Sequence, residues 1–180
     1  DSELLNNAND GIFADGDSLS IDESNISNNG NDGLQGSETD ATVTNSNLTD
    51  NNIDGFVLFD DSSATVSGSN LSNNLDGLDV RSTSDVSVTG STLSDNNDGI
   101  AVSGDVDDLT VTDSQIQNND IGVDVNADTD NVTVVRNNIV DNGGVNDEWG
   151  IRESFTSPGL TVNATLNWWG NATGPGGEPL

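Results

Sequence analysis

The chain of 180 residues contains no cysteine, histidine, methionine, tyrosine or lysine. Their absence excludes disulfides, thiolate or imidazole metal ligands, and catalysis by histidine. No run of apolar residues is long enough for a transmembrane helix, so we expect no membrane insertion. Only 31% of the residues are hydrophobic, which in an ordinary globular chain would indicate disorder. A repeat fold avoids that outcome, because each small unit is covered by its neighbours.

Positive charge is almost absent, since three arginines stand against 32 acidic residues and the formal net charge is −29. Nucleic acids and anionic membranes bind cationic side chains, so we expect neither as a partner. The acidic residues are mostly Asp and are scattered along the whole chain. This pattern favours adaptation to high salt, where counterions screen the repulsion. A calcium-loaded extracellular protein is the alternative.

A short motif of Asp, Gly and an apolar residue recurs along the sequence at a fixed step. Its glycines are separated by 22 residues each time, and two looser copies follow after steps of 23 and 28 residues. These glycines are Gly11, Gly33, Gly55, Gly77, Gly99, Gly122 and Gly150. A period in the low twenties indicates a solenoid.

Apolar residues alternate with polar ones at two places in each repeat, and a single apolar residue follows five positions later. Near the centre of the chain these are Ile100/Val102, Leu109/Val111 and Ile116. A period of two is typical of a strand with one buried face. The second alternating pairs are Leu19/Ile21, Ala41/Val43, Ala64/Val66, Val86/Val88, Leu109/Val111, Val132/Val134 and Leu160/Val162. Three short strands per repeat predict an all-β, three-sided parallel β-helix of about seven coils of 22–23 residues.

We expect one β-helix domain over residues 1–180, with regular coils in 1–142 and an irregular last coil and C-terminal cap in 143–180. Glu153 stands there at an inward position that should be apolar. Trp168 and Trp169 are the largest apolar side chains near that end. We expect them to cover the last coil or to form an assembly contact, since an open β-helix end exposes backbone groups.

The 22-residue repeats resemble the right-handed parallel β-helix repeat family. The closing stretch Asn167-Trp168-Trp169-Gly170 and Gly174-Pro175-Gly176-Gly177 resembles the end of β-helix proteins secreted by halophilic archaea. The resemblance implies a right-handed coil and an extracellular or cell-surface location. It implies little about activity, because the family includes lyases, hydrolases, epimerases, phage spikes and structural surface proteins.

One aspartate of each regular repeat occupies the position just before the glycine. These residues are Asp10, Asp32, Asp54, Asp76 and Asp98. Stacked about 5 Å apart on the outside of the rod, they could bind Ca²⁺ or monovalent cations. The alternative is that each Asp accepts a backbone N–H within its own turn. We expect no organic cofactor.

A column of asparagines is expected four residues before the glycines, with Asp95 as the exception. Its members are Asn7, Asn29, Asn51, Asn73 and Asn118. Stacked amides can hydrogen-bond from coil to coil, so we interpret this column as structural. The glycines themselves indicate either a positive φ angle or a close approach between coils.

Six Asn-X-Ser/Thr sequences are candidate glycosylation sites if the protein is extracellular. They begin at Asn25, Asn47, Asn70, Asn131, Asn163 and Asn171. The first three each precede an inward apolar residue, so alternation places the Asn on the outer face. Chance is the alternative, since the chain is rich in Asn, Ser and Thr.

The family's lyases and hydrolases imply carboxylates and a basic residue on an outer face. Only the C-terminal third supplies such a set, and the candidate carbohydrate site contains Arg136, Asp147, Glu148, Trp149 and Arg152. Paired carboxylates could act as acid and base on a sugar that stacks on a tryptophan. The alternative is that Arg152 only forms ion pairs with the surrounding acids.

Three functional hypotheses follow. The first is a non-catalytic extracellular structural protein, in which a first coil without a cap stacks end to end on another copy to form a filament. The second is a carbohydrate-binding or polysaccharide-processing β-helix with its site near Trp149 and Arg152. The third is a stalk or adhesin module of a larger surface protein.

Overall fold

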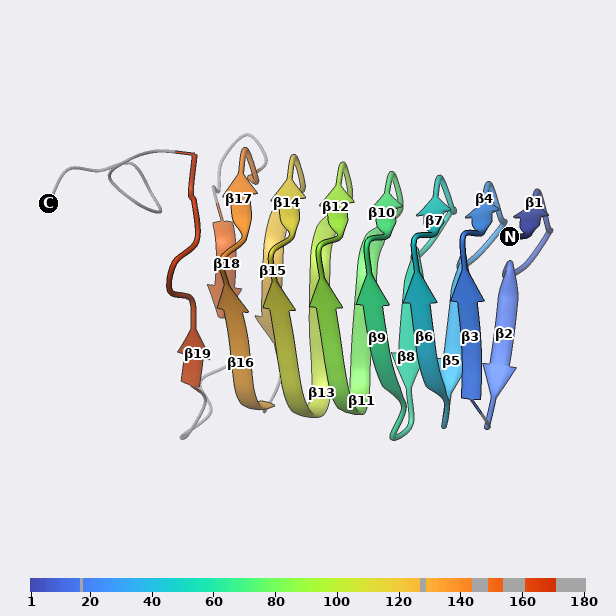
Figure 1. Cartoon of the computed structure of the whole chain (residues 1–180), viewed down its shortest axis with the longest axis horizontal. Helices are drawn as coiled ribbons and strands as arrows, with labels where there is room; N and C mark the ends of the chain where they lie inside the picture. The colour runs from blue at the N-terminus through green and yellow to red at the C-terminus, as the bar shows by residue number, and fades with distance from the viewer. Residues whose placement is uncertain (17, 127–128, 144–148, 154–160, 171–180) are drawn as a thin grey trace, which may run out of the picture.

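The computed structural model describes the chain except residues 17, 127–128, 144–148, 154–160 and 171–180. The described residues form a rod of stacked parallel β-strands, with successive coils side by side from β1 to β19 (Figure 1). The all-β solenoid predicted from the repeat is confirmed. No helix in the described part of the chain is long and apolar enough to cross a membrane.

Each coil contributes one strand to each of three sides, and the strands of a side pair in parallel. The first side contains β1 (Glu3–Leu5), β4 (Asn25–Ser27), β7 (Asn47–Thr49), β10 (Asn70–Ser72), β12 (Thr92–Ser94), β14 (Gln115–Gln117) and β17 (Asn138–Val140). The second side contains β2 (Ile12–Asp15), β5 (Leu34–Ser37), β8 (Phe56–Phe59), the first part of β11 (Asp76–Thr89), the first part of β13 (Asp98–Thr112), β15 (Ile121–Asn126) and β18 (Trp149–Glu153). The third side contains β3 (Ser18–Asp22), β6 (Asp40–Thr44), β9 (Ser63–Ser67), the second parts of β11 and β13, β16 (Thr129–Val135) and β19 (Thr161–Asn163). Because β11 and β13 turn a corner without a break, they belong to two sides.

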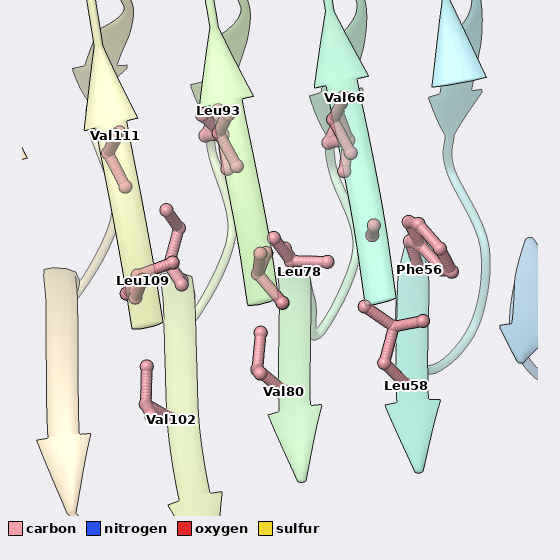
Figure 2. Close-up of a cluster of buried hydrophobic side chains, with 14 of the residues drawn as sticks. Phe56, Leu58, Val66, Leu78, Val80, Leu93, Val102, Leu109 and Val111 are labelled. Carbon is pink, nitrogen blue, oxygen red and sulfur yellow. The ribbon is translucent and has the colours of Figure 1, made fainter. Parts of the chain in front are cut away.

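The core is a set of apolar columns that run along the rod. On the second side, Phe56 pairs with Leu78 and Leu78 with Ile100, and each of the three is fully buried. Figure 2 shows such side chains pointing from all three sides into the space between them. Each inward residue is thus covered by the coil before it and the coil after it, as the low hydrophobic content requires.

The repeated glycines mark close approaches between coils. A Cβ atom on Gly99 would lie 2.5 Å from the carbonyl oxygen of Gly122 in the next coil, and a Cβ on Gly77 would lie 2.6 Å from that of Gly99. None of these three glycines has a positive φ angle. The close-approach alternative is therefore correct, and the positive-φ alternative is wrong.

A continuous column of asparagine amides, buried except at the exposed Asn7, closes the corner between the first and second sides. The backbone N–H of Asn51 donates to the side-chain oxygen of Asn74 at 2.9 Å, and that of Asn74 donates to Asn96 at 2.9 Å. The column contains Asn7, Asn29, Asn51, Asn74, Asn96, Asn119 and Asn142.

The expected membership of this column is wrong from the fourth coil onward. Asn73, Asp95 and Asn118 instead occupy the preceding position, where φ is 56–58°. An Asn or Asp tolerates this left-handed conformation better than most other residues. The prediction placed these residues in the column because it counted backward from the glycines.

A second column at the corner between the third and first sides escaped the sequence analysis. The hydroxyl of Ser46 accepts the backbone N–H of Ser24 at 3.0 Å, and the same pattern continues through the later coils. Its members are Ser24, Ser46, Ser69, Ser91, Ser114, Asn137 and Asn167. The two polar columns satisfy backbone groups that turn away from the strands.

Candidate functional site

An acidic strip runs along the outer surface of the second side. It contains Asp32, Asp54, Asp76, Asp79, Asp98 and Asp124, together with Arg81 and Arg152. Asp79 stands between the inward residues Leu78 and Val80, so strand alternation turns its side chain outward, but it is buried and pairs with Arg81. Asp124 occupies the equivalent place in β15, two coils later, and is likewise buried.

The aspartates before the glycines form a hydrogen-bonded ladder between coils. Asp32 Oδ1 accepts the backbone N–H of Asp54 at 3.0 Å, and Asp76 Oδ1 accepts that of Asp98 at 3.1 Å. Asp10 and Asp54 accept in the same way from the coil that follows each. Each Asp therefore accepts a backbone N–H from the next coil and not, as one of the two alternatives had it, from its own turn.

This Asp column is also less exposed than expected. Asp54 is 2% exposed, Asp98 8% and Asp32 9%, so three of the five expected outer carboxyls are buried. Burial, followed by the charges of Asp79, Asp76 and Asp32, raises the pKa of Asp54 to about 7. Burial, followed by the charges of Asp76 and Asp124, also raises the pKa of Asp98 to about 7.

The first of two arginine–carboxylate centres on the strip surrounds Arg81. Its Nε donates to Asp79 Oδ2 at 2.6 Å, its Nη2 contacts the same oxygen, and Nη2 lies 3.6 Å from Asp54 Oδ2. The guanidinium carbon lies 5.1 Å from the ring centroid of Phe59. Carboxylate oxygens of Asp54, Asp76 and Asp79 lie within 4.8 Å of one another, a spacing that a hard cation can bridge.

The second centre surrounds Arg152, which β18 places beside Asp124 of β15. Arg152 Nε donates to Asp124 Oδ1 at 3.0 Å, and Nη2 donates to Oδ2 at 2.5 Å. This bidentate geometry is the strong form of an Arg–carboxylate pair. Trp149, 44% exposed, begins the same strand, in the column that contains Asp98 and Ile121.

Asp98 is the ladder residue that carries an unpaired oxygen. Its Oδ1 is buried and has no hydrogen-bond partner in the described part of the chain. The reason is that Ile121 replaces the next Asp, and the N–H of Ile121 donates to the carbonyl of Asn97 at 3.0 Å instead. Asp98 stands in register to Asp124 as Asp54 stands to Asp79, so this carboxyl belongs to the second centre.

The two centres share the positions of their aspartates but not those of their arginines, since Arg81 follows Asp79 in the same strand and Arg152 lies in register with Asp124 in the next coil. Asp54 and Asp79 in the first centre correspond in register to Asp98 and Asp124 in the second, two coils away. At about 4.8 Å per coil the separation is about 10 Å. Each centre has a buried ladder carboxyl, an Asp–Arg pair and a nearby aromatic side chain.

The candidate carbohydrate residues do not form one cluster. Trp149 and Arg152 both lie on β18, at the strip. Arg136 lies elsewhere, at the corner between β16 and β17. It pairs with the exposed Asp113, with Nε–Oδ1 and Nη2–Oδ2 distances of 3.0 and 2.8 Å. Asp147 and Glu148 are outside the described residues. The expected ion pairing of Arg152 is present.

Asp79, Arg81 and Asp124 are strip residues that the sequence analysis missed. Each occupies an outward position of a strand whose inward residues the repeat predicts. Strand alternation was therefore the only sign in the sequence that these side chains lie on the outer face. Scattered aspartates throughout the chain hid that signal. Only the register between coils shows which aspartates face an arginine.

Three of the candidate glycosylation sites, Asn25, Asn47 and Asn70, pair in register on adjacent coils of the first side. Among the described candidates, Asn47, Asn131 and Asn163 are exposed, whereas Asn25 and Asn70 are half-buried. Asn171 is outside the described residues.

The two tryptophans near the C-terminus differ in environment. Trp169 packs against the end of the core, and its ring would lie 2.8 Å from a Cβ placed on Gly150. Trp168 is 54% exposed, and its backbone exchanges hydrogen bonds with Asn137 and Ile139 in the preceding coil. An end cap formed by Trp169 and an assembly contact formed by Trp168 remain predictions.

Solved structures of similar fold include two enzymes. A periplasmic alginate epimerase, AlgG, superposes with a TM-score of 0.71 at 18% identity, over 92% of this chain and 43% of its own. The pectate lyase Pel9A superposes with a TM-score of 0.58 at 18% identity, over 92% of this chain and 52% of its own. The chain thus spans about half the length of these enzymes, and at this identity the likeness concerns the fold.

Comparison with curated protein sequences gives no significant match. Residues 1–139 match the sequence model of a family described as the right-handed β-helix region. That match covers most of the chain and agrees with the parallel coils, the inward apolar columns and the polar corner columns. The chain belongs to the right-handed β-helix family.

Proposed function

We propose that this protein is a secreted polysaccharide-binding β-helix, and that the sugar chain lies along the acidic strip. The observation that carries the proposal is the repetition of an aspartate pair, Asp54/Asp79 and Asp98/Asp124, at equivalent positions two coils apart. An arginine pairs with the second aspartate of each, although Arg81 lies in the same coil as Asp79 and Arg152 lies one coil beyond Asp124. A polymer of similar units matches a surface of similar sites. Carboxylates and guanidinium groups hydrogen-bond sugar hydroxyls, while aromatic rings contact the apolar faces of sugars.

The strip also has the chemistry that sugar processing needs. Asp54 and Asp98 have pKa values of about 7, so each exchanges a proton readily near neutral pH. Asp54 has two further carboxylates, those of Asp76 and Asp79, within 4.8 Å. Cleavage of glycosidic bonds commonly uses a pair of carboxyl groups at short distance. We therefore extend the proposal to acid–base chemistry on the bound sugar.

Similar solved folds support the proposal by association. The two structures named above are an alginate epimerase and a pectate lyase, and the epimerase is periplasmic. Both act on polysaccharides, which agrees with a polysaccharide ligand and a secreted location here. The halophilic archaeal resemblance and the salt adaptation remain predictions.

The test measures binding and turnover on a panel of polysaccharides. Affinity electrophoresis measures binding, and an assay of new reducing or unsaturated ends measures turnover. We expect one or more polysaccharides to bind, and binding to weaken in the double variant Asp124→Asn/Arg152→Gln, which removes both charges of the pair together. Asp107→Asn is the matched control, since Asp107 is exposed on β13 and lies on the third side. Binding that is equal in all three proteins would contradict the assignment to the strip.

The structural-subunit hypothesis makes a different prediction for the same samples. A protein that binds no polysaccharide but forms end-to-end rods in molar salt, seen by negative-stain microscopy, would replace our proposal with the filament hypothesis. A stalk or adhesin module by itself would neither bind a polysaccharide nor form end-to-end rods.

A further inference from the structure

We propose that the acidic strip takes an uncharged polysaccharide, with one sugar unit held by the Asp124–Arg152 pair beside Trp149. This inference rests on the proposed function and adds to it the class of sugar and the residues of one subsite. It departs from the two enzymes of similar fold, whose named substrates, alginate and pectate, are polymers of uronic acids.

Every cationic side chain in the protein already faces a carboxylate. The sequence contains three arginines and no lysine or histidine. Arg81 pairs with Asp79, Arg152 pairs with Asp124, and Arg136 pairs with an aspartate away from the strip. A uronate carboxylate would therefore approach each guanidinium group beside a carboxylate that repels it, and displacing a buried Asp from its arginine is costly.

The strip as a whole has the wrong sign for an anionic polymer. It carries six aspartates and two arginines. Even with Asp54 and Asp98 protonated, four carboxylates remain against two guanidinium groups. Like charges at these distances repel, and a net charge of −29 adds to the repulsion. An uncharged sugar carries no such cost, and its hydroxyls can both donate to the carboxylates and accept from the guanidinium groups.

The second centre is the better candidate for a subsite because it holds an unsatisfied group. Asp98 is 8% exposed, and its Oδ1 lacks any hydrogen-bond partner in the part of the chain that the structure describes. Buried polar atoms without a partner are rare in folded proteins and indicate a missing donor. Protein atoms cover Oδ1, so a sugar hydroxyl reaches it only if the side chains around Asp98 move when the sugar binds. The exposed Trp149 stands in the same column as Asp98, two coils further along.

The experiment compares two classes of polymer in the presence of EDTA at pH 7. Uncharged glucans, xylans and mannans form one set, and polygalacturonate and alginate form the other. We expect binding within the uncharged set only, unchanged by EDTA or by added Ca²⁺. Trp149→Leu and the double variant Asp124→Asn/Arg152→Gln should each weaken that binding by about tenfold or more, while Asp107→Asn leaves it unchanged. Circular dichroism confirms that each variant is folded.

An added cation provides an independent arm. Ala101 lies in register between Asp79 and Asp124, so Ala101→Lys places one cation between two aspartates of the strip. Because these aspartates would pair with the lysine, we expect the variant to bind no uronate, and uronate binding by it would contradict the charge argument. Uronate binding by the natural protein, either without metal or only with Ca²⁺, would overturn the uncharged class but leave the proposed function standing. Failure of both polymer sets to bind would defeat the proposed function itself.

Discussion

The side-chain oxygen of Asn96 accepts a hydrogen bond from the backbone N–H of Asn74, one coil earlier, at 2.9 Å. The amide nitrogen of Asn96 donates to the carbonyl of Leu71 and to the side chain of Asn119, each at 3.1 Å. One buried side chain thus satisfies groups from the coil before it and links to the coil after it. Because these groups have no access to water, the fold depends on this amide.

We expect Asn96→Ala to lower the free energy of unfolding by about 2–4 kcal/mol, since it strands a buried N–H and a buried carbonyl. Chemical denaturation in molar salt measures the loss. Asn52→Ala is the control, because Asn52 is exposed and donates only one long bond of 3.3 Å to Gly30. A loss for Asn96→Ala no larger than that of the control would show that the amide column is dispensable.

Glycine is required at position 99 by space rather than by backbone angle. Gly99→Ala would place a Cβ 2.5 Å from a backbone oxygen of the next coil, so the coils would have to separate. Gly90→Ala meets nothing within 4 Å but has a φ of 59°. We expect a loss of about 1 kcal/mol for Gly90→Ala and a clearly larger loss for Gly99→Ala. Equal melting temperatures for the two variants would contradict the close approach.

Stability should decrease as pH rises toward neutrality. Asp54 and Asp98 have folded-state pKa values of about 7, above the ordinary value of 3.8. A raised carboxyl pKa means that the folded state binds more protons than the unfolded state. Its contribution to stability is full below pH 4 and is lost as pH rises through 7. We expect a higher melting temperature at pH 5 than at pH 8, at constant molar salt.

Asp98→Ile isolates one part of this pH dependence. Ile121 occupies the same column position in the next coil, so the substitution fits the register and removes the carboxyl with the unpaired oxygen. We expect the variant to melt above the natural protein at pH 8 and to show a smaller difference between pH 5 and pH 8. An unchanged difference would mean that Asp98 does not titrate near 7.

The repeat predicts the fold well, because the spacing of the glycines and the alternation of apolar and polar residues can be read directly from the sequence. The glycines, the inward columns of residues such as Leu78 and Leu93, and the parallel coils follow directly from them. The asparagine column shows the limit. One additional residue at the corner near Asp60 is compensated by one fewer before Gly77, so the step between glycines stays at 22 while the asparagine shifts by one position.

The candidate site is harder to predict for two physical reasons. Whether a corner Asp such as Asp54 is exposed depends on which side chains of the next coil lie near it, here Asp76, Asp79 and Arg81, and the composition gives no sign of its burial. The partner of Arg152 lies 28 residues earlier, across the irregular last coil. Neither a period nor a motif determines that register, so ion pairing could be expected but Asp124 could not be named.

Added calcium tests whether the cluster of three carboxylates formed by Asp54, Asp76 and Asp79 binds a cation. Arg81 already supplies positive charge there, so we expect millimolar CaCl₂ to raise the melting temperature of the natural protein by less than about one degree. Arg81→Gln removes that charge, and calcium should then stabilise the variant by several degrees. Asp107→Asn controls for general screening. A large calcium effect on the natural protein would support the cation-binding Asp column instead.

The central claim is that a polysaccharide lies along the acidic strip, and footprinting by hydroxyl radicals tests it most directly. Trp149 and Leu75, 44% and 51% exposed, lie on the strip and at its edge, whereas Trp168, 54% exposed, lies near the C-terminal end of the rod. With a bound polysaccharide we predict slower oxidation of Trp149 and Leu75 and an unchanged rate at Trp168. Protection of Trp168 alone, or unchanged rates at Trp149 and Leu75 while the polysaccharide is bound, would contradict the account.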